Sequence, residues 1–199
     1  ATTFNMLRAN DLIWSFVINN YLLGKEPFPF DLLYWNSDST RMPAAMHSYY
    51  LRNMYQSNKL IEPGGLIVDK VSIDLSRIDL PTYILATRED HIAPWKSAFA
   101  GTRAYSGPVR FVLAASGHIA GVVNQPAANK NCHWTNAKKA ASPDAWLAAA
   151  QRVEGSWWHD WHGWITKLDA RKVKARKPGG GKRKPIEEAP GSYVQLRLM

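Results

Sequence analysis

The stretch YILATREDHIAPW, residues 83–95, places an acidic pair soon after a short apolar run. The stretch FVLAASGHIAG, residues 111–121, repeats this layout with a histidine after the run. The apolar runs at 83–86 and 110–115 are each too short for a helix, and the segment between them has the length of one short helix. This order predicts a parallel βαβ unit, with both polar clusters at the carboxyl edge of one sheet.

The residue types at that edge fit acid–base chemistry. A histidine at position 118 can take a proton from a nucleophile and return it to a leaving group, and a carboxylate holds its tautomer. In an α/β-hydrolase fold the acid and the histidine of a catalytic triad follow two strands in this order. Asp90 and His118 are therefore the predicted catalytic residues. Glu89 and His91 are alternative candidates for the group that holds His118. Asp90 is favoured because its shorter side chain leaves less freedom in the hydrogen bond to His118.

The nucleophile that such a triad needs is not recognisable in this chain. No G-x-C-x-G or G-x-S-x-G turn occurs in residues 1–89. Cys132, the single cysteine, comes after both predicted partners and stands in KNCHWTN without flanking glycines, so it is predicted to be a loop cysteine. The chain alone is expected to be inactive. A single cysteine also excludes an internal disulfide and fits a reducing compartment.

The pattern changes along the chain in three parts. Residues 1–64 are helical and rich in aromatic residues, with one helix capped by Asp11 and ended by Gly24, and another after Pro43. Residues 65–166 form the α/β part. They begin with GGLIVDKVSIDL, whose alternation predicts a hairpin.

Near the end of the α/β part, SPDAWLAAAQRVEG predicts one helix that is capped by Ser142 and closed by Gly155. Pro- and Asn-containing residues before it are predicted to be a loop. Three tryptophans, Trp157, Trp161 and Trp164, then recur at helical spacing, which is typical of a core or an interface.

Residues 167–199 form a basic tail containing Gly and Pro. The net charge of +9 is concentrated there, so it describes a tail rather than a basic groove. A solvated flexible extension is the simpler interpretation, and contact with nucleic acid or another acidic surface is the alternative. No apolar run approaches the roughly 20 residues that span a bilayer, and no export signal is expected. His159, Asp160 and His162 resemble a metal site only in composition, so no metal is predicted.

Several long stretches resemble the class I polyhydroxyalkanoate synthases, which polymerise 3-hydroxyacyl-CoA into storage polyester. The matching stretches are FNMLRANDLIWSFVINNYLLG, PFDLLYWNSDSTRMP, YLRNMYQ, REDHIAPW, FVLAASGHIAGVVN, HWTN, GSWW and APGSYV. The resemblance implies an α/β-hydrolase-type domain in which a cysteine in a G-x-C-x-G turn is acylated by the CoA thioester. It makes His118 the base and Asp90 the triad carboxylate, which would assist the incoming 3-hydroxyl either directly or through His118. It also makes the chain the C-terminal part of such a domain.

The resemblance also implies roles for the other parts. Residues 1–64 would be a lid insertion that contributes to a homodimer, with Trp35 near the contact, and residues 65–166 the C-terminal part of the catalytic core. The enzyme would use no cofactor and would act in the cytoplasm at the surface of polyester granules, with granule-associated proteins as partners. The rivals are a serine-dependent esterase or lipase, and a non-enzymatic protein that binds through the basic tail.

Overall fold

The computed structural model describes residues 9–27 and 41–193. Met42–Ala175 form one compact unit, and the residues before 42 and after 175 belong to a second. The predicted boundaries after residues 64 and 166 stay predictions. Among the described helices, none is both long and apolar enough to cross a bilayer.

The described part of the second unit contains a helical segment with the π-helical stretches η1 (Asn10–Trp14) and η2 (Val17–Leu22). Gly24 has a φ of 62°, so this glycine ends the helix in the left-handed conformation, as predicted. The predicted cap at Asp11 is wrong, because Ala9 and Asn10 are already helical. Trp35 lies outside the described residues.

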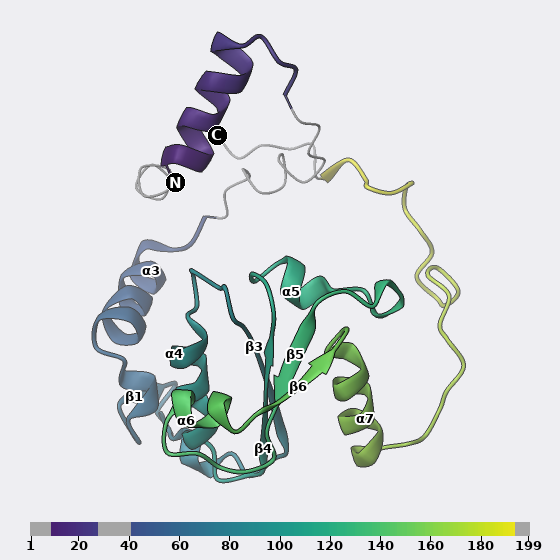
Figure 1. Ribbon diagram of the computed structural model, residues 1–199. Helices are drawn as coiled ribbons and strands as arrows, with labels where there is room; N and C mark the ends of the chain where they lie inside the picture. The colour runs from purple at the N-terminus through teal and green to yellow at the C-terminus, as the bar shows by residue number, and fades with distance from the viewer. Residues whose placement is uncertain (1–8, 28–40, 194–199) are drawn as a thin grey trace. The chain divides into compact units, whose positions relative to one another are not determined.

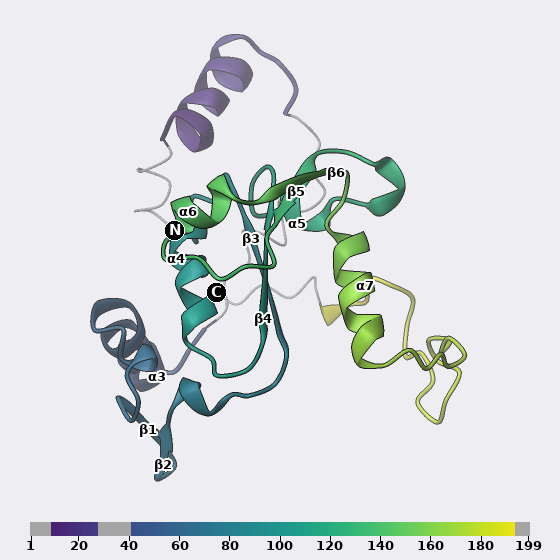
Figure 2. The same cartoon turned by 60° about the horizontal axis from the view of Figure 1, so that its bottom comes forward.

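The compact unit begins with α3 (Ala44–Tyr50) and η3 (Leu51–Gln56), which confirm the helical pattern after Pro43. Strands β1 (Leu66–Val68) and β2 (Val71–Ile73) then pair antiparallel. Asp69 and Lys70 join them with φ values of 46° and 65°, the left-handed pair typical of a two-residue hairpin. The predicted hairpin is confirmed. Figures 1 and 2 show it close to α3 and apart from the larger sheet.

The larger sheet has the strand order β3-β4-β5-β6. Strands β3 (Thr82–Thr87) and β4 (Val109–Ala114) are parallel, and α4 (Trp95–Ala100) lies between them in the sequence. The predicted parallel βαβ unit is confirmed. The remaining short helices are η4 (Lys59–Ile61), η5 (Leu75–Arg77), η6 (Gly101–Arg103), α5 (Ala120–Val123) and η7 (Pro126–Ala128).

Two strands correct the sequence prediction. β5 (Cys132–Thr135) lies where a loop was predicted, and it pairs antiparallel with β4. The helix predicted to reach Gly155 ends at Ala148 as α6 (Pro143–Ala148), and β6 (Gln151–Glu154) follows and pairs with β5. The cap at the start of α6 was predicted correctly, since the Ser142 hydroxyl accepts a hydrogen bond from the Ala145 N–H at 3.1 Å, whereas the predicted closure at Gly155 is wrong. Strand pairing therefore outweighs the helical propensity of this segment.

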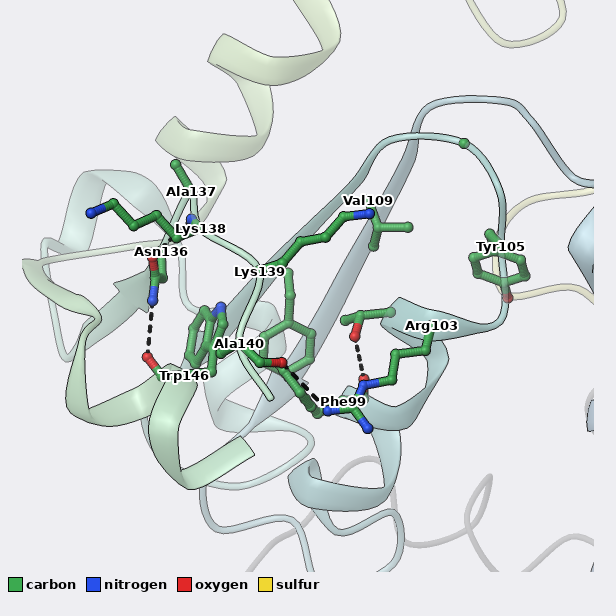
Figure 3. A pocket seen from close by; sticks show the side chains of 13 residues that line it. Phe99, Arg103, Tyr105, Val109, Asn136, Ala137, Lys138, Lys139, Ala140 and Trp146 are labelled. Carbon is green, nitrogen blue, oxygen red and sulfur yellow. Dashed lines mark hydrogen bonds between the residues drawn. The ribbon is translucent and has the colours of Figure 1, made fainter. Parts of the chain in front are cut away.

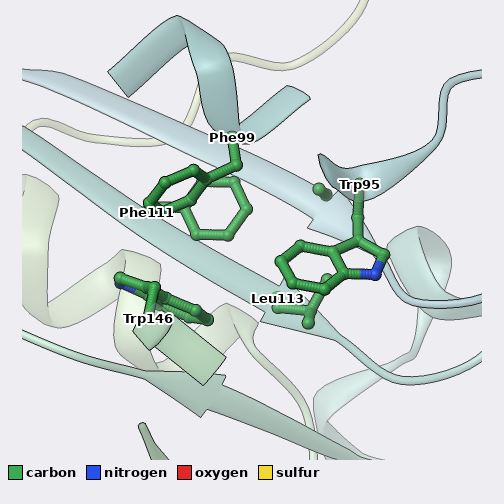
Figure 4. Close-up of a cluster of buried hydrophobic side chains, with 6 residues drawn as sticks. Trp95, Phe99, Phe111, Leu113 and Trp146 are labelled. Atoms are coloured by element: carbon green, nitrogen blue, oxygen red, sulfur yellow. The ribbon is translucent and has the colours of Figure 1, made fainter. Parts of the chain in front are cut away.

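Alternate residues of β4 enter two cores on opposite faces of the sheet. On one face Phe111 and Leu113 pack against α4 and α6, as Figure 4 shows, with Trp95, Phe99 and Trp146. On the other face Val112 and Ala114 pack against Trp157 and the helix α7 (Trp158–Leu168). Figure 1 shows α4 and α6 on one side of the sheet and α7 on the other. This three-layer α/β arrangement holds the ends of β3 and β4 in place.

The tryptophan stripe belongs to the second core. Trp157 and Trp158 stack with ring centroids 4.7 Å apart, and both indole N–H groups donate to the Val122 carbonyl, at 3.0 and 3.2 Å. The ring of Trp164 lies against that of Tyr83, with centroids 5.3 Å apart. These contacts support the core interpretation of the stripe.

Candidate active site

The loops that follow β3 and β4 are fastened to each other by backbone hydrogen bonds. The Arg88 N–H donates to the Ala114 carbonyl at 2.8 Å, and the Glu89 N–H donates to the Ser116 carbonyl at 3.0 Å. Ser116 has a φ of 70°, a conformation that non-glycine residues adopt rarely and at some cost. The two loops therefore form one joined corner at the carboxyl edge of the parallel strands.

Gly121 allows α5 to approach the strand ends closely. A Cβ atom at this position would lie 2.4 Å from the Ala115 carbonyl oxygen and 2.9 Å from Cγ2 of Thr87. The Gly121 N–H also donates to the Gly117 carbonyl at 2.8 Å, which closes the loop around His118. A larger residue at 121 would push this loop away from the sheet.

The structure brings the two predicted site residues together at this corner. His118 Nδ1 lies 3.5 Å from Asp90 Oδ1, which is close enough for an ion pair. The two atoms are not aligned as a hydrogen bond. The Asp90 side chain is 13% exposed and that of His118 32%. Asp90 Oδ1 also accepts the N–H groups of Ile92 and Ala93, at 2.8 and 3.0 Å. The backbone therefore orients the carboxylate toward the imidazole.

The surroundings of Asp90 favour its anionic form. Burial acts to raise the pKa of this carboxyl, but the N–H groups of Ala93 and Ile92 and the nearby His118 and His91 lower it, and the net pKa lies below its usual value. Asp90 is consequently ionised at neutral pH. A fixed negative charge beside Nδ1 can stabilise an imidazolium at His118.

The exposed part of His118 faces away from the carboxylate. Nδ1 is buried, and within the described part of the chain it has no hydrogen-bond partner, whereas about a third of the side chain is exposed. The exposed third of the side chain therefore belongs to atoms other than Nδ1. A histidine with Nδ1 next to a carboxylate and its opposite side open has the geometry of a general base.

The two competing residues occupy less suitable positions. Glu89 is exposed, and its backbone N–H, not its carboxylate, ties it to the corner. His91 is exposed and meets the His118 ring edge to face, with centroids 5.1 Å apart. His91 therefore flanks the His118 ring, and Asp90 is the carboxylate that faces it.

Sequence reasoning missed Thr87, the last residue of β3. Its side chain is 2% exposed, and its hydroxyl has no hydrogen-bond partner among the described residues. It lies directly under the loop corner, in contact range of a Cβ at Gly121. Nothing in the sequence distinguishes Thr87 from other strand threonines. Only its place at the carboxyl end of β3 brings its buried hydroxyl close to the loop corner.

Cys132 is not a loop cysteine, as was predicted, but the first residue of β5. It is buried, and its carbonyl accepts the Ala115 N–H at 2.9 Å. The guanidinium of Arg152 interacts with the thiol, which raises the pKa of Arg152. No contact with His118 occurs in the described structure, so the geometry gives Cys132 the place of a packed strand residue.

Asp160, one of the three residues with a metal-like composition, has a different role. Its carboxylate accepts hydrogen bonds from Tyr83 Oη at 3.0 Å and from Arg110 Nε at 2.7 Å, and pairs with Arg110 Nη2 as well. His159 and His162 are exposed. No group of three or more metal-ligating side chains occurs within residues 9–27 and 41–193. Asp160 thus fastens α7 to the sheet.

Known proteins resemble the chain along almost its whole length. It is 54% identical over 197 residues to the poly(3-hydroxyalkanoate) polymerase subunit PhaC of Rhizobium meliloti (strain 1021), covering 99% of this chain and 32% of that protein. It is 49% identical over 198 residues to the protein of the same name from Cupriavidus necator, covering 99% and 34%. Poly(3-hydroxyalkanoate) polymerase 2 of Ectopseudomonas oleovorans is 43% identical, at 99% and 35% coverage.

No family model matches the sequence. The chain spans about a third of the length of the curated relatives it matches. The similarity nevertheless includes the strands, the loop corner and the aromatic core described above, because it covers 99% of this chain. At identities of 40–54% over nearly its whole length, the chain is homologous to about a third of each of these poly(3-hydroxyalkanoate) polymerases.

Proposed function

We propose that this chain supplies the general base and the carboxylate of a polymerase that joins 3-hydroxyacyl groups from CoA thioesters into polyester and releases CoA. The observation that carries the proposal is the contact between His118 Nδ1 and Asp90 Oδ1, 3.5 Å apart at the carboxyl edge of β3 and β4. The names of the relatives support the reaction class. The nucleophile is a cysteine in a part of the enzyme outside these residues.

In the proposed first step, the cysteine sulfur attacks the thioester carbonyl while His118 takes the thiol proton. The new carbon–sulfur bond replaces the bond to the CoA sulfur, and the imidazolium returns the proton to the departing CoA thiolate. In the second step a 3-hydroxyl group attacks the enzyme-bound thioester. His118 takes the hydroxyl proton and returns it to the cysteine sulfur, so each ester bond formed leaves the enzyme unchanged.

Asp90 acts as the positioning residue in this proposal. Its carboxylate is held by two backbone N–H groups, so it does not have to reorganise when His118 becomes charged. Its lowered pKa keeps Asp90 anionic at neutral pH. The carboxylate can therefore stay in place beside His118 whether the imidazole is neutral or charged.

The other parts of the chain complete the proposal. Residues 65–166 form the C-terminal part of an α/β-hydrolase-type core, residues 1–64 a lid that contributes to a homodimer, and residues 167–199 a basic tail. The enzyme uses no cofactor and acts at the surface of polyester granules in the cytoplasm, together with granule-associated proteins. The mixed α/β sheet is compatible with such a core, and the names of the relatives favour a polymerase over a serine hydrolase.

The test uses the full 199-residue chain fused to the part of the Rhizobium meliloti relative that it does not match, with 3-hydroxybutyryl-CoA as substrate. We expect the fusion to release CoA and form polymer, and His118→Ala to lower the rate about 10³-fold, because general acid–base catalysis contributes in this range. His162→Ala is the matched control, since His162 is an exposed histidine on α7. It should keep the parental rate.

Two outcomes would contradict the proposal. A fusion whose His118→Ala variant releases CoA as fast as the parent, with the same thermal midpoint, would remove His118 from the reaction. Release of free 3-hydroxybutyrate in place of polymer would indicate a hydrolase. Asp90→Asn separates the two roles of this carboxylate. If the variant fails to release even the first equivalent of CoA, Asp90 acts through His118. If it releases the first equivalent but no more, Asp90 acts on the incoming hydroxyl group.

A further inference from the structure

A hollow lies near the amino end of β4, away from the loops that carry Asp90 and His118. Its volume is about 330 Å³, and Val109, the first residue of β4, is part of its wall. Figure 3 shows residues from α4, η6, β4 and the loop at 136–140 around it. The hollow reaches along β4 (Val109–Ala114) as far as Phe111, and none of its described lining residues belongs to the loops that carry Asp90 and His118. It is therefore a separate site.

The wall of the hollow is basic. Arg103, Lys138 and Lys139 line it, and no carboxylate stands among its described lining residues. The Arg103 guanidinium donates to the Ala140 and Ala141 carbonyls, so it holds the loop in place over the hollow. Figure 3 shows the Lys139 side chain running toward Val109, whereas Lys138 extends in the other direction. One ammonium group thus lies along the hollow.

The floor is apolar and rigid. Phe111 packs edge to face against two other rings. The ring centroids are 5.1 Å apart for Phe99 and Phe111 and 4.9 Å apart for Phe111 and Trp146. All three side chains are buried, which leaves them little freedom to collapse into the space. The Asn136 amide already donates to the Trp146 carbonyl and accepts from the Lys138 N–H. The floor is consequently a packed aromatic layer that keeps the shape of the hollow and exposes little surface of its own.

We propose that this hollow binds a small organic carboxylate with an apolar body, its charge against the Lys139 ammonium and its body against the apolar side chains of the wall. The lysine that runs along the hollow matches a single negative charge, and Val109 and Tyr105 offer the body of the ligand apolar contact. The volume is at the lower end of small-molecule sites, which sets the size of the ligand. This binding site is independent of the proposed polymerisation.

The experiment measures binding to the full 199-residue chain by titration calorimetry, with hexanoate, hexan-1-ol and inorganic phosphate as probes. Hexanoate should bind at least about tenfold more tightly than hexan-1-ol, because only the carboxylate can pair with Lys139. Lys139→Gln should weaken hexanoate binding about tenfold. Lys138→Gln, the neighbouring lysine that points the other way, should change it less than about twofold.

Each contrary result overturns the proposal in a recognisable way. Equal affinity for hexan-1-ol would leave only an apolar crevice, and displacement of hexanoate by phosphate would indicate a site for bare anions. Equal losses in the two lysine variants would show a diffuse effect of surface charge. Absence of hexanoate binding in a chain that unfolds cooperatively would remove the site altogether. All of these readouts are independent of CoA release.

Discussion

Replacing Asp160 by Asn removes the charge that fastens α7 to the sheet while keeping the shape of the side chain. In the structure this carboxylate accepts a hydrogen bond from Tyr83 and makes a two-pronged contact with Arg110, through Nε at 2.7 Å and Nη2. Asn keeps one acceptor oxygen and turns an N–H group toward Arg110. The substitution therefore tests the charge of the network without emptying space in the core.

The expected magnitude follows from the burial of the pair. The Asp160 side chain is 16% exposed and that of Arg110 32%. A hydrogen bond to a charged group contributes about 1.5–3 kcal/mol, and the exposed third of Arg110 lets water recover part of the loss. We expect Asp160→Asn to lower the free energy of unfolding by about 2 kcal/mol at pH 7.

The same network makes the loss depend on pH. Burial acts to raise the pKa of Asp160, but the hydrogen bonds from Arg110 and Tyr83 outweigh it and hold the pKa below its usual value. A carboxyl whose pKa is lower in the folded state contributes stability above its unfolded pKa of about 3.9, and this contribution is lost as the pH falls through the folded pKa. The difference between parent and variant should therefore shrink below about pH 4.

Urea unfolding followed by tryptophan fluorescence measures both effects. Asp144→Asn is the matched control, because Asp144 forms an ion pair of 2.7 Å with Lys96 in which the side chains are 70% and 54% exposed. It should cost less than about 0.5 kcal/mol. The reasoning is refuted if Asp160→Asn costs no more than Asp144→Asn at pH 7, or if its cost is the same at pH 3 as at pH 7.

Two further predictions concern the backbone. Gly121→Ala should destabilise the chain by about 2 kcal/mol, because its Cβ would lie 2.4 Å from the Ala115 carbonyl oxygen. Gly163→Ala is the control inside α7. Its Cβ would meet no atom within 4 Å, so it should stabilise the chain by about 0.5–1 kcal/mol. Thermal unfolding of both variants decides this, and equal signs would contradict it. Ser142→Ala should cost about 1 kcal/mol in urea unfolding through loss of the α6 cap; an unchanged midpoint would show that the cap is dispensable.

Local signals in the sequence were sufficient for the elements that depend on local chemistry. The hairpin at 66–73 was predicted because its alternation and turn lie within a few neighbouring residues. The parallel pair β3 and β4 was predicted because two apolar runs flank one short helix. The start of α6 was predicted from its cap.

Elements that depend on distant partners were missed or misread. β5 has a sequence with Asn and Lys around it and no clear alternation, and it becomes a strand because β4 offers its free edge. Residues 151–154 continue a helical pattern but pair with β5. Pairing between strands contributes backbone hydrogen bonds that no window of neighbouring residues can reveal.

By itself the sequence determined the chemistry of the candidate site: a carboxylate after one strand and a histidine after the next, in the order that a triad requires. Only the tertiary structure decided which groups meet. It placed Asp90, and not Glu89, against His118, joined Asp160 of α7 to Arg110 of β4, and put Lys139 in the wall of a hollow. The physical reason is that residue type fixes what a group can do, whereas the packing of distant strands and helices fixes what it can reach.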